Sequence, residues 1–292
     1  MPTMLWLLLA LATAVFTASG DAFSKHYLRP FGSPNMALAR VLGPTLFLFP
    51  FLFFWPWPPL PEKFWLSLAI LYPLETIAML CYMEAIRVSP LSVTVPYLAF
   101  TPAFIIVTGY LILGEKLSLQ GICGILLIVS GSYCLHLSEV KHGLWAPFKA
   151  TFKERGSWLM LLVALIYSVT SVLLKVGLKH SERFFFAFFY YTFLGLFMVP
   201  ILVIFFRANP IKVARGCPKG FLAVALSQSA AVVCHVWALS LAPTAYMIAI
   251  KRLSVLFGVI IGGLFFKERA FGARLVGASL MVAGVFLIAL AR

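Results

Sequence analysis

Charge is what this sequence of 292 residues has least of. Only 11% of its residues are Asp, Glu, Lys or Arg, whereas a soluble domain carries about a quarter. Hydrophobic residues make up 62%, and the mean hydropathy is +1.01. These values exclude a soluble globular protein. Runs of about 20 apolar residues recur, and they are continuous, unlike the alternating segments of a β-barrel. The sequence therefore predicts an all-α integral membrane protein.

Sequence motifs that carry enzyme chemistry are also missing. The five cysteines form no C-x-x-C or other metal-ligand spacing. There is no glycine-rich phosphate loop with a lysine, no H-E-x-x-H and no nucleophile elbow. We therefore expect no enzymatic activity, no cofactor and no bound metal. Without a nucleotide site, any transport must run downhill or draw on an ion gradient.

Ten apolar runs are each long enough to span a bilayer as a helix. Their approximate limits are 4–26, 35–55, 64–86, 90–113, 118–137, 158–178, 184–206, 219–240, 243–266 and 270–291. A long polar connection, 138–157, separates residues 1–137 from residues 158–292, so that each part holds five spans. Because five is odd, the two parts must cross the membrane in opposite senses. The expected fold is ten transmembrane helices in two inverted five-helix repeats.

An internal sequence repeat supports this division. The stretch from Glu75 to Leu137 recurs without a gap from Gln228 to Leu290, and thirteen of its 63 positions are identical. The identities include glycines, a proline and an acidic residue, so shared hydrophobicity alone does not explain them. A duplicated membrane chain is typical of a transporter built from two pseudo-symmetric halves.

Basic residues outnumber acidic ones by 23 to nine, which gives a net charge of +14. In a soluble protein this would suggest nucleic acid, but here the basic residues gather in short loops, so we expect no nucleic-acid partner. Fourteen lie in the loops after the odd-numbered spans, and five lie in the opposite loops and the C-terminus. The positive-inside rule then predicts that both termini lie outside the cytoplasm. The expected location is the plasma (inner) membrane, as a multi-pass protein.

The closing block of each half resembles the drug/metabolite transporter superfamily, EamA-like type. In both halves an alanine stands five residues before a proline, and an acidic residue and a closing glycine follow. These residues are Ala85, Pro90, Glu115 and Gly131 in the first half and Ala238, Pro243, Glu268 and Gly284 in the second. The resemblance covers nearly the whole chain and implies a ten-helix secondary transporter with inverted repeats. By that resemblance, spans one, three, four, six, eight and nine line a central cavity and spans five and ten pack behind. Several relatives keep both termini in the cytosol, opposite to the charge count.

Glu75 is a candidate functional residue because it lies deep in the third span. A carboxylate near the bilayer centre usually faces a cavity, a partner or a proton path. Its repeat counterpart is Gln228, so the same depth carries a polar group in both halves. We predict that the two face a polar site and that Glu75 carries a proton. The structural alternative is a neutral or hydrogen-bonded Glu75 between helices.

Lys251 and Arg252 lie inside the ninth span, where the first repeat has Leu98 and Ala99. The two halves must differ where an asymmetric substrate binds. A guanidinium can grip a carboxylate or phosphate through two hydrogen bonds, and a lysine supplies a compact charge. Plastid phosphate translocators in the superfamily also use cationic side chains in their cavity. The pair is therefore a candidate anion-binding element; alternatively it neutralises Glu75 or extends toward the interface.

Several further residues have both a functional and a structural interpretation. His235, the counterpart of Tyr82, and the aromatic residues Tyr97, Trp237 and Tyr246 are candidate substrate contacts, although such side chains more often pack between helices. Glu115 and Glu268 are expected to stabilise the N-terminus of the helix that follows each. Two same-face pairs, Asp21 with Lys25 and Glu84 with Arg87, are expected to be local ion pairs. Glycines two turns apart, Gly124/Gly131 and Gly277/Gly284, and the Gly258/Gly262 pair allow close helix contacts, within the bundle or in a homodimer.

The sequence thus predicts a secondary transporter of a small polar metabolite, anionic or zwitterionic, with a candidate coupling proton. One alternative is a flippase-type carrier of a lipid-linked head group. A site that opens sideways to lipid would favour this alternative. A second alternative is a membrane scaffold subunit without its own transport. Neither the substrate nor the direction of transport is defined by the sequence.

Overall fold

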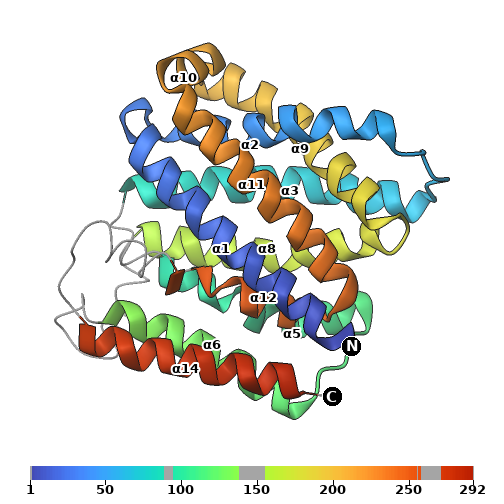
Figure 1. Ribbon diagram of the computed structural model, residues 1–292, viewed down its shortest axis with the longest axis vertical. Coiled ribbons are helices and arrows are strands. Elements are labelled where there is room, and N and C mark those ends of the chain that lie inside the picture. Colours follow the sequence, from blue (N-terminus) through green and yellow to red (C-terminus); the bar gives the residue numbers. More distant parts are fainter. Residues whose placement is uncertain (1, 89–94, 138–154, 255, 258–270, 292) are drawn as a thin grey trace.

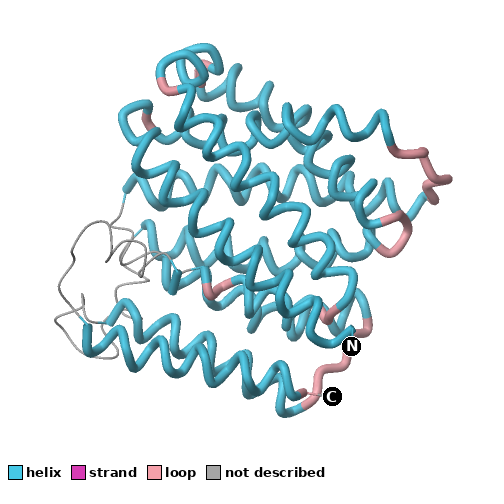
Figure 2. The backbone as a smooth tube through the Cα atoms, viewed as in Figure 1, coloured by secondary structure: helices cyan, strands magenta, loops and turns pink. Residues whose placement is uncertain are grey.

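The computed structural model describes residues 2–88, 95–137, 155–254, 256–257 and 271–291. Over these residues the chain is helical and contains no strand, as Figure 2 shows. The main helices are α1 (Pro2–Leu28), α2 (Ser33–Leu48), α3 (Glu62–Val88), α5 (Thr101–Leu113), α6 (Leu119–Leu137), α8 (Arg155–Leu178), α9 (Arg183–Phe206), α11 (Pro218–Leu241), the short α12 (Thr244–Lys251) and α14 (Phe271–Leu290). The predicted all-α fold is thus confirmed for the described part of the chain.

The helices follow the predicted apolar runs, with three differences. The second run ends as a 3₁₀ helix, η2 (Phe49–Phe54), because Pro50 cannot donate the backbone hydrogen bond that would extend α2. The described part of the fourth run begins as another 3₁₀ helix, η3 (Val95–Phe100). A short helix that was not predicted, α10 (Pro210–Gly216), is capped by the side chain of Asn209. A three-residue 3₁₀ turn, η1 (Arg29–Phe31), links α1 to α2.

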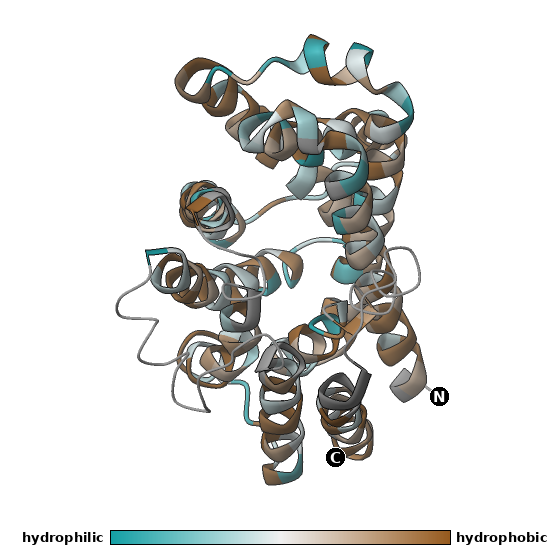
Figure 3. Ribbon diagram, turned by 90° about the vertical axis from the view of Figure 1, so that its left-hand side faces the viewer, coloured by the Kyte–Doolittle hydropathy of each residue, from teal (hydrophilic) through white to brown (hydrophobic). Residues whose placement is uncertain are grey.

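Within the described part of the chain, six stretches of helix are long and apolar enough to cross a membrane. They are Met4–Leu28, Ser33–Phe54, Glu62–Tyr82, Arg155–Leu178, Arg183–Phe206 and Pro218–Leu241. Hydropathy colouring shows apolar segments along most of the bundle (Figure 3). Large apolar side chains such as Phe54, Leu111 and Phe205 are at least 74% exposed. A surface of this kind is stable in contact with lipid, so the chain is a multi-pass integral membrane protein.

The helix contacts are reciprocal between the two halves. The first helix of each half packs against the third helix of the other, α1 against α11 and α8 against α3. The second, fourth and fifth helices pack against their own counterparts, α2 on α9, α5 on α12 and α6 on α14. Figure 1 shows α6 and α14 lying side by side along one edge of the molecule. Two copies of one unit related by a twofold axis make contacts of this kind.

Glycines form the contact between α6 and α14. A Cβ on Gly124 would lie 2.8 Å from the carbonyl oxygen of Gly284, and one on Gly131 would lie 2.6 Å from that of Gly277. Since Gly277 and Gly284 are the repeat counterparts of Gly124 and Gly131, the crossed pairing is itself reciprocal. These glycines therefore serve packing within the bundle. The Gly258/Gly262 element lies outside the described residues.

Candidate functional site

Helix α12 ends at the two cationic residues of the ninth span. The backbone N–H of Arg252 donates to the carbonyl oxygens of both Ile248 and Ala249 at 3.1 Å, and Leu253 N–H donates to Ile250 O at 2.9 Å. The helix thus tightens into a turn at Lys251 and Arg252. The equivalent segment of the first half is η3, because Val95 corresponds to Ile248 and Phe100 to Leu253. Discontinuous helices at corresponding positions of two repeats are typical of transporter binding sites.

The side chains of Arg252 and Lys251 leave the helix in different directions. Arg252 Nη2 donates a hydrogen bond of 2.7 Å to Thr101 Oγ1, the first residue of α5. Lys251 lies within electrostatic reach of Glu75 of α3, whose carboxylate lies near the hydroxyl of Thr170 on α8. The structure therefore brings together the predicted cationic pair and the predicted deep carboxylate, with residues from both halves.

These residues belong to a larger set of interacting side chains that we call the polar centre. Its members are Asp21 (α1), Arg40 (α2), Glu75 and Tyr82 (α3), Tyr167 and Thr170 (α8), Tyr190 and Tyr191 (α9), His235 (α11), and Lys251 and Arg252 (α12). Three of its members are basic and two are acidic, so with His235 neutral the set carries one net positive charge. A charged set of this size within membrane helices marks a substrate or ion pathway.

Arg40 is the charged member of the polar centre that the sequence analysis did not name. Its guanidinium forms a 2.6 Å ion pair with Asp21, and its backbone carbonyl accepts a hydrogen bond from the Tyr191 hydroxyl at 3.1 Å. The sequence did contain a signal for Arg40, because a lone arginine within an apolar run is unusual. The expected partner of Asp21, Lys25, has a side chain outside the described part, and the ion pair seen for Asp21 reaches across to α2.

Helix α11 presents buried polar atoms toward the neighbouring helices. Gln228 Nε2 and His235 Nδ1 have no hydrogen-bond partner among the described residues, and the same is true of Arg252 Nε. Gln228 and His235 are each only 9% exposed and are seven residues apart, so they lie on one face of α11. Gln228 lies against Gly20 of α1, where any Cβ would collide with its amide. Buried polar groups without a protein partner mark places where a polar ligand or water can bind.

The three predicted aromatic contacts occupy different surroundings. The hydroxyl of Tyr246 interacts with Ser118 N and Ser118 Oγ at 3.2 and 3.3 Å, and the ring is 7% exposed. The ring of Trp237 packs edge-on against Phe184 at 5.2 Å. Tyr97 stacks on Phe100 within an apolar cluster that Tyr82 and Tyr167 also contact. The hydroxyl of Tyr246 thus joins α12 to the loop before α6, whereas Trp237 packs through its ring and its buried Nε1 has no hydrogen-bond partner among the described residues. Tyr97 lies beside the polar centre.

Glu115 forms a second polar cluster at one end of the bundle. Gly114, with φ of 65°, adopts the left-handed conformation that ends α5, and Glu115 N–H then bonds back to Gly109 O at 3.2 Å. This turn directs the carboxylate toward the second half. There Glu115 Oε2 accepts from the backbone N–H of Thr244 at 2.9 Å, and Oε1 accepts from the Thr244 hydroxyl at 3.1 Å. Glu115 therefore stabilises the N-terminus of α12, not that of the following helix α6 as predicted; Glu268 lies outside the described residues.

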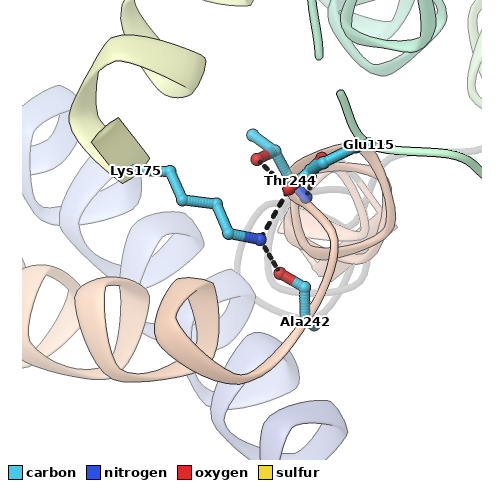
Figure 4. Close-up of polar contacts among 4 residues, drawn as sticks. All are labelled: Glu115, Lys175, Ala242 and Thr244. Carbon is cyan, nitrogen blue, oxygen red and sulfur yellow. Dashed lines mark hydrogen bonds and ion pairs between the residues drawn. The ribbon is translucent and has the colours of Figure 1, made fainter. Parts of the chain in front are cut away.

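Lys175 completes this cluster from α8. Its Nζ is 2.6 Å from Glu115 Oε1 and 2.5 Å from the carbonyl oxygen of Ala242, as Figure 4 shows. The side chains of Glu115 and Lys175 are only 13% and 12% exposed. We call Glu115, Lys175, Ala242 and Thr244 the joint cluster, because Ala242 and Thr244 flank the joint between α11 and α12.

Other features lie apart from these two clusters. Glu84, expected to pair with Arg87, lies 3.6 Å from Arg155 of α8, and the Arg87 side chain is outside the described part. A groove of about 660 Å³ runs between α1, α2, η2, α9 and α11. It is lined by Phe16, Phe47, Leu48, Phe51, Phe188, Leu226, Ser227, Ser229, Ala230, Val233 and Cys234. Two lining side chains, Phe47 and Leu226, are each 44% exposed, so the groove opens toward lipid.

Comparison with known proteins supports the fold and the class of the chain. One solved crystal structure aligns over 98% of this chain and 95% of its own, with a TM-score of 0.67 and 13% identity, which shows a shared fold. Curated protein sequences give no match. The model of the EamA-like transporter family matches residues 4–137 and 154–290, which is nearly the whole sequence. The predicted relationship is confirmed: the chain belongs to the EamA-like transporter family.

Proposed function

We propose that this protein is a secondary transporter of a small polar metabolite, anionic or zwitterionic, that works by alternating access. The observation that carries the proposal is the polar centre, in which a broken helix from one half presents Lys251 and Arg252 beside Glu75 from the other. Arginine binds carboxylate or phosphate through two parallel hydrogen bonds, and lysine adds a mobile charge. The net positive charge of the polar centre favours an anionic group on the substrate.

Buried hydrogen-bond donors without a partner in the described part of the protein form a second part of the proposed site. Gln228 Nε2 and Arg252 Nε have no hydrogen-bond partner among the described residues. A substrate that carries a hydroxyl or carbonyl oxygen beside its anionic group would satisfy such donors. Because a buried unpaired donor costs about 1–3 kcal/mol, substrates that lack this second group should bind much more weakly.

Glu75 is the proposed proton carrier. Its carboxylate lies near the hydroxyl of Thr170 and within electrostatic reach of Lys251. Protonation of Glu75 would remove the negative charge next to Lys251 and raise the net charge of the polar centre from +1 to +2. Proton binding at Glu75 and anion binding at Lys251 would then favour each other, which is the coupling that proton-driven uptake requires.

Alternating access rests on the proposed inverted architecture, with ten spans in two five-helix halves in the plasma membrane. Helix α1 packs on α11 just as α8 packs on α3, and the glycines of α6 and α14 pair crosswise. These contacts support two halves related by a twofold axis. In such an arrangement one half can rock against the other around a site at their interface.

The lipid-linked head group remains the second candidate, because the lateral groove opens toward lipid. Its only polar lining residues are Ser227 and Ser229, and both hydroxyls donate to carbonyl groups of their own helix, at Ala223 and Ala225. None of its lining residues is charged, whereas a phosphate head group needs cationic partners. The charged residues lie in the polar centre, and this favours a water-soluble metabolite. A scaffold subunit would leave that centre without a role.

A thermal-shift screen of the purified full-length protein tests the proposal. The compounds are amino acids, organic acids, sugar phosphates and nucleotides, each measured against the parent, Lys251→Ala and a matched control, Lys212→Ala on the exposed face of α10. A ligand of the folded state raises the melting temperature as its site saturates. We expect an anionic compound to stabilise the parent and Lys212→Ala but not Lys251→Ala. Equal stabilisation of all three proteins would contradict the site.

A further inference from the structure

The joint between α11 and α12 is held from both halves of the chain. From the first half, Glu115 accepts two hydrogen bonds from Thr244, the first residue of α12. From the second half, Lys175 of α8 donates to Ala242 O, the C-cap of α11, and pairs with Glu115. Three hydrogen bonds thus reach Ala242 and Thr244, on either side of Pro243, and a fourth contact joins Lys175 to Glu115. The side chains of Glu115 and Lys175 are largely buried, and buried charge-assisted contacts are stronger than exposed ones.

Helix α12 is short enough for this cluster to control its position. It has eight residues, with Thr244 at its start and Lys251 at its end. At the far end, the Arg252 side chain bonds to Thr101 at the start of α5, while Glu115 immediately follows the end of α5 and its capping Gly114. Helices α5 and α12 therefore run antiparallel and are tied together at both ends. A rigid two-turn helix transmits any shift at Thr244 to Lys251.

We infer that Glu115 and Lys175 are positioning residues for the substrate site, which they do not themselves touch. They fix the α11–α12 joint against α5 and α8, and so determine where Lys251 and Arg252 stand in the polar centre. This assignment rests on the proposed role of the cationic pair in binding substrate. It explains why a carboxylate and an ammonium group are kept buried together at one end of the bundle, where isolated charges would be costly.

The test measures the mobility of α12 without any substrate. A cysteine replaces Ala249, which is fully buried on α12 two residues before Lys251, or Ala187, which is 1% exposed on α9. Each is placed in the full-length protein in lipid vesicles and exposed to a small maleimide. Mass spectrometry of the labelled peptide separates the new site from the five native free cysteines. Labelling of a buried cysteine reports local opening of its helix.

Three substitutions in the joint cluster are compared in the protein with the cysteine at position 249 and in the protein with the cysteine at position 187. Glu115→Ala removes the cap and the ion pair, and Glu115→Gln keeps an oxygen that can accept from Thr244 N–H. Lys175→Met removes the ion pair and the hydrogen bond to Ala242 O but leaves the cap in place. We expect Glu115→Ala to speed labelling at position 249 by about tenfold, the scale of losing a helix cap together with a buried partner. Glu115→Gln and Lys175→Met should each give a smaller increase. Position 187 should label at the parent rate throughout.

Glu182→Gln is the matched control. Glu182 caps α9 through Phe184 N–H and Phe185 N–H but makes its bonds within its own half. Unchanged labelling at 249 in Glu115→Ala would overturn the inference, and so would an equal rise at 187, which would indicate general destabilisation. If Glu115→Ala does not accumulate, Glu115→Gln and Lys175→Met decide by the same criterion. A rise confined to 249, with anion binding unaffected by Lys251→Ala, would keep the positioning role and refute the proposed function.

Discussion

Two equivalent segments of the repeats, 95–100 and 248–253, show where the halves agree and where they part. The first is the 3₁₀ helix η3, which leads into α5, and the second contains the tightened turn that ends α12, so neither is regular α-helix throughout. The first carries Leu98 and Ala99, which are 7% and 1% exposed among apolar neighbours. The second carries Lys251 and Arg252 among the charged residues of the polar centre. The repeat has thus kept a backbone feature in both halves and placed the charge in only one.

The conserved glycines of the repeat give the opposite case. Gly124 and Gly131 recur as Gly277 and Gly284, and all four lie in the contact between α6 and α14. Identity between the halves therefore accompanies packing, where twofold contacts impose the same demand on both copies. Difference accompanies the polar centre, where under the proposed function one asymmetric substrate would contact both halves at once. The following variants are chosen to break or sharpen this comparison.

The largest effect is expected from the cationic pair. Lys251→Met should weaken binding of the anion found in the screen by at least about 30-fold, or about 2 kcal/mol, because a buried charged partner is lost. The melting temperature without ligand should change little, because Lys251 lies near two other cations, Arg40 and Arg252, as well as near the two carboxylates Glu75 and Asp21. Titration calorimetry and a thermal melt measure the two quantities.

The matched control is Leu98→Met, at the equivalent position of the first repeat. It should leave anion affinity unchanged, since an apolar residue of similar volume replaces another. If Leu98→Met weakened binding as much as Lys251→Met, the two segments would contribute alike and the functional difference between the halves would be refuted.

Glu75→Gln should separate binding from coupling. The variant keeps a hydrogen-bonding group next to Thr170 but cannot exchange a proton. In liposomes with a pH difference of one unit, uptake coupled to one proton accumulates substrate about tenfold. We expect Glu75→Gln to bind the anion at least as tightly as the parent yet to reach only equal concentrations on both sides. Glu62→Gln, on the exposed first turn of α3, should accumulate substrate like the parent; accumulation by Glu75→Gln would exclude Glu75 as the carrier.

The shared scaffold should respond equally in the two halves. A Cβ at Gly124 would lie 2.7 Å from Ile288 Cγ1, and one at Gly284 would lie 2.7 Å from Ile128 Cγ1. Gly124→Ala and Gly284→Ala should therefore each destabilise the protein by a similar amount, about 1–3 kcal/mol, the usual cost of overpacking. Ser130→Ala, exposed on α6, is the control in thermal melts. Strongly unequal losses would show that the two repeats do not share this contact.

The sequence was sufficient to predict the helices, because they follow local hydropathy, and the repeat, because it depends on identical residues at a constant offset. It was also sufficient to single out Glu75 and Lys251 as charged residues inside apolar helices, since a charge within an apolar run is visible without a structure. It was not sufficient for the partners of Glu115. Lys175 lies 60 residues away and Thr244 129 residues away, so their meeting depends on which helices pack together. Same-face spacing predicted a partner for Asp21 on its own helix, whereas the described ion pair joins two helices.

The smallest effect is expected at Tyr246, which the sequence suggested as a substrate contact. In the structure its hydroxyl bonds to Ser118 and helps to hold α12 against the loop before α6. Tyr246→Phe should therefore lower stability by about 1 kcal/mol, the net value of a typical hydrogen bond, and leave anion affinity within twofold of the parent. Tyr110→Phe, 57% exposed on α5, is the matched control and should change neither quantity. A loss of affinity with an unchanged melting temperature would instead make Tyr246 part of the binding site, and would extend the functional difference between the halves beyond the cationic pair, because its counterpart in the first repeat is Val93.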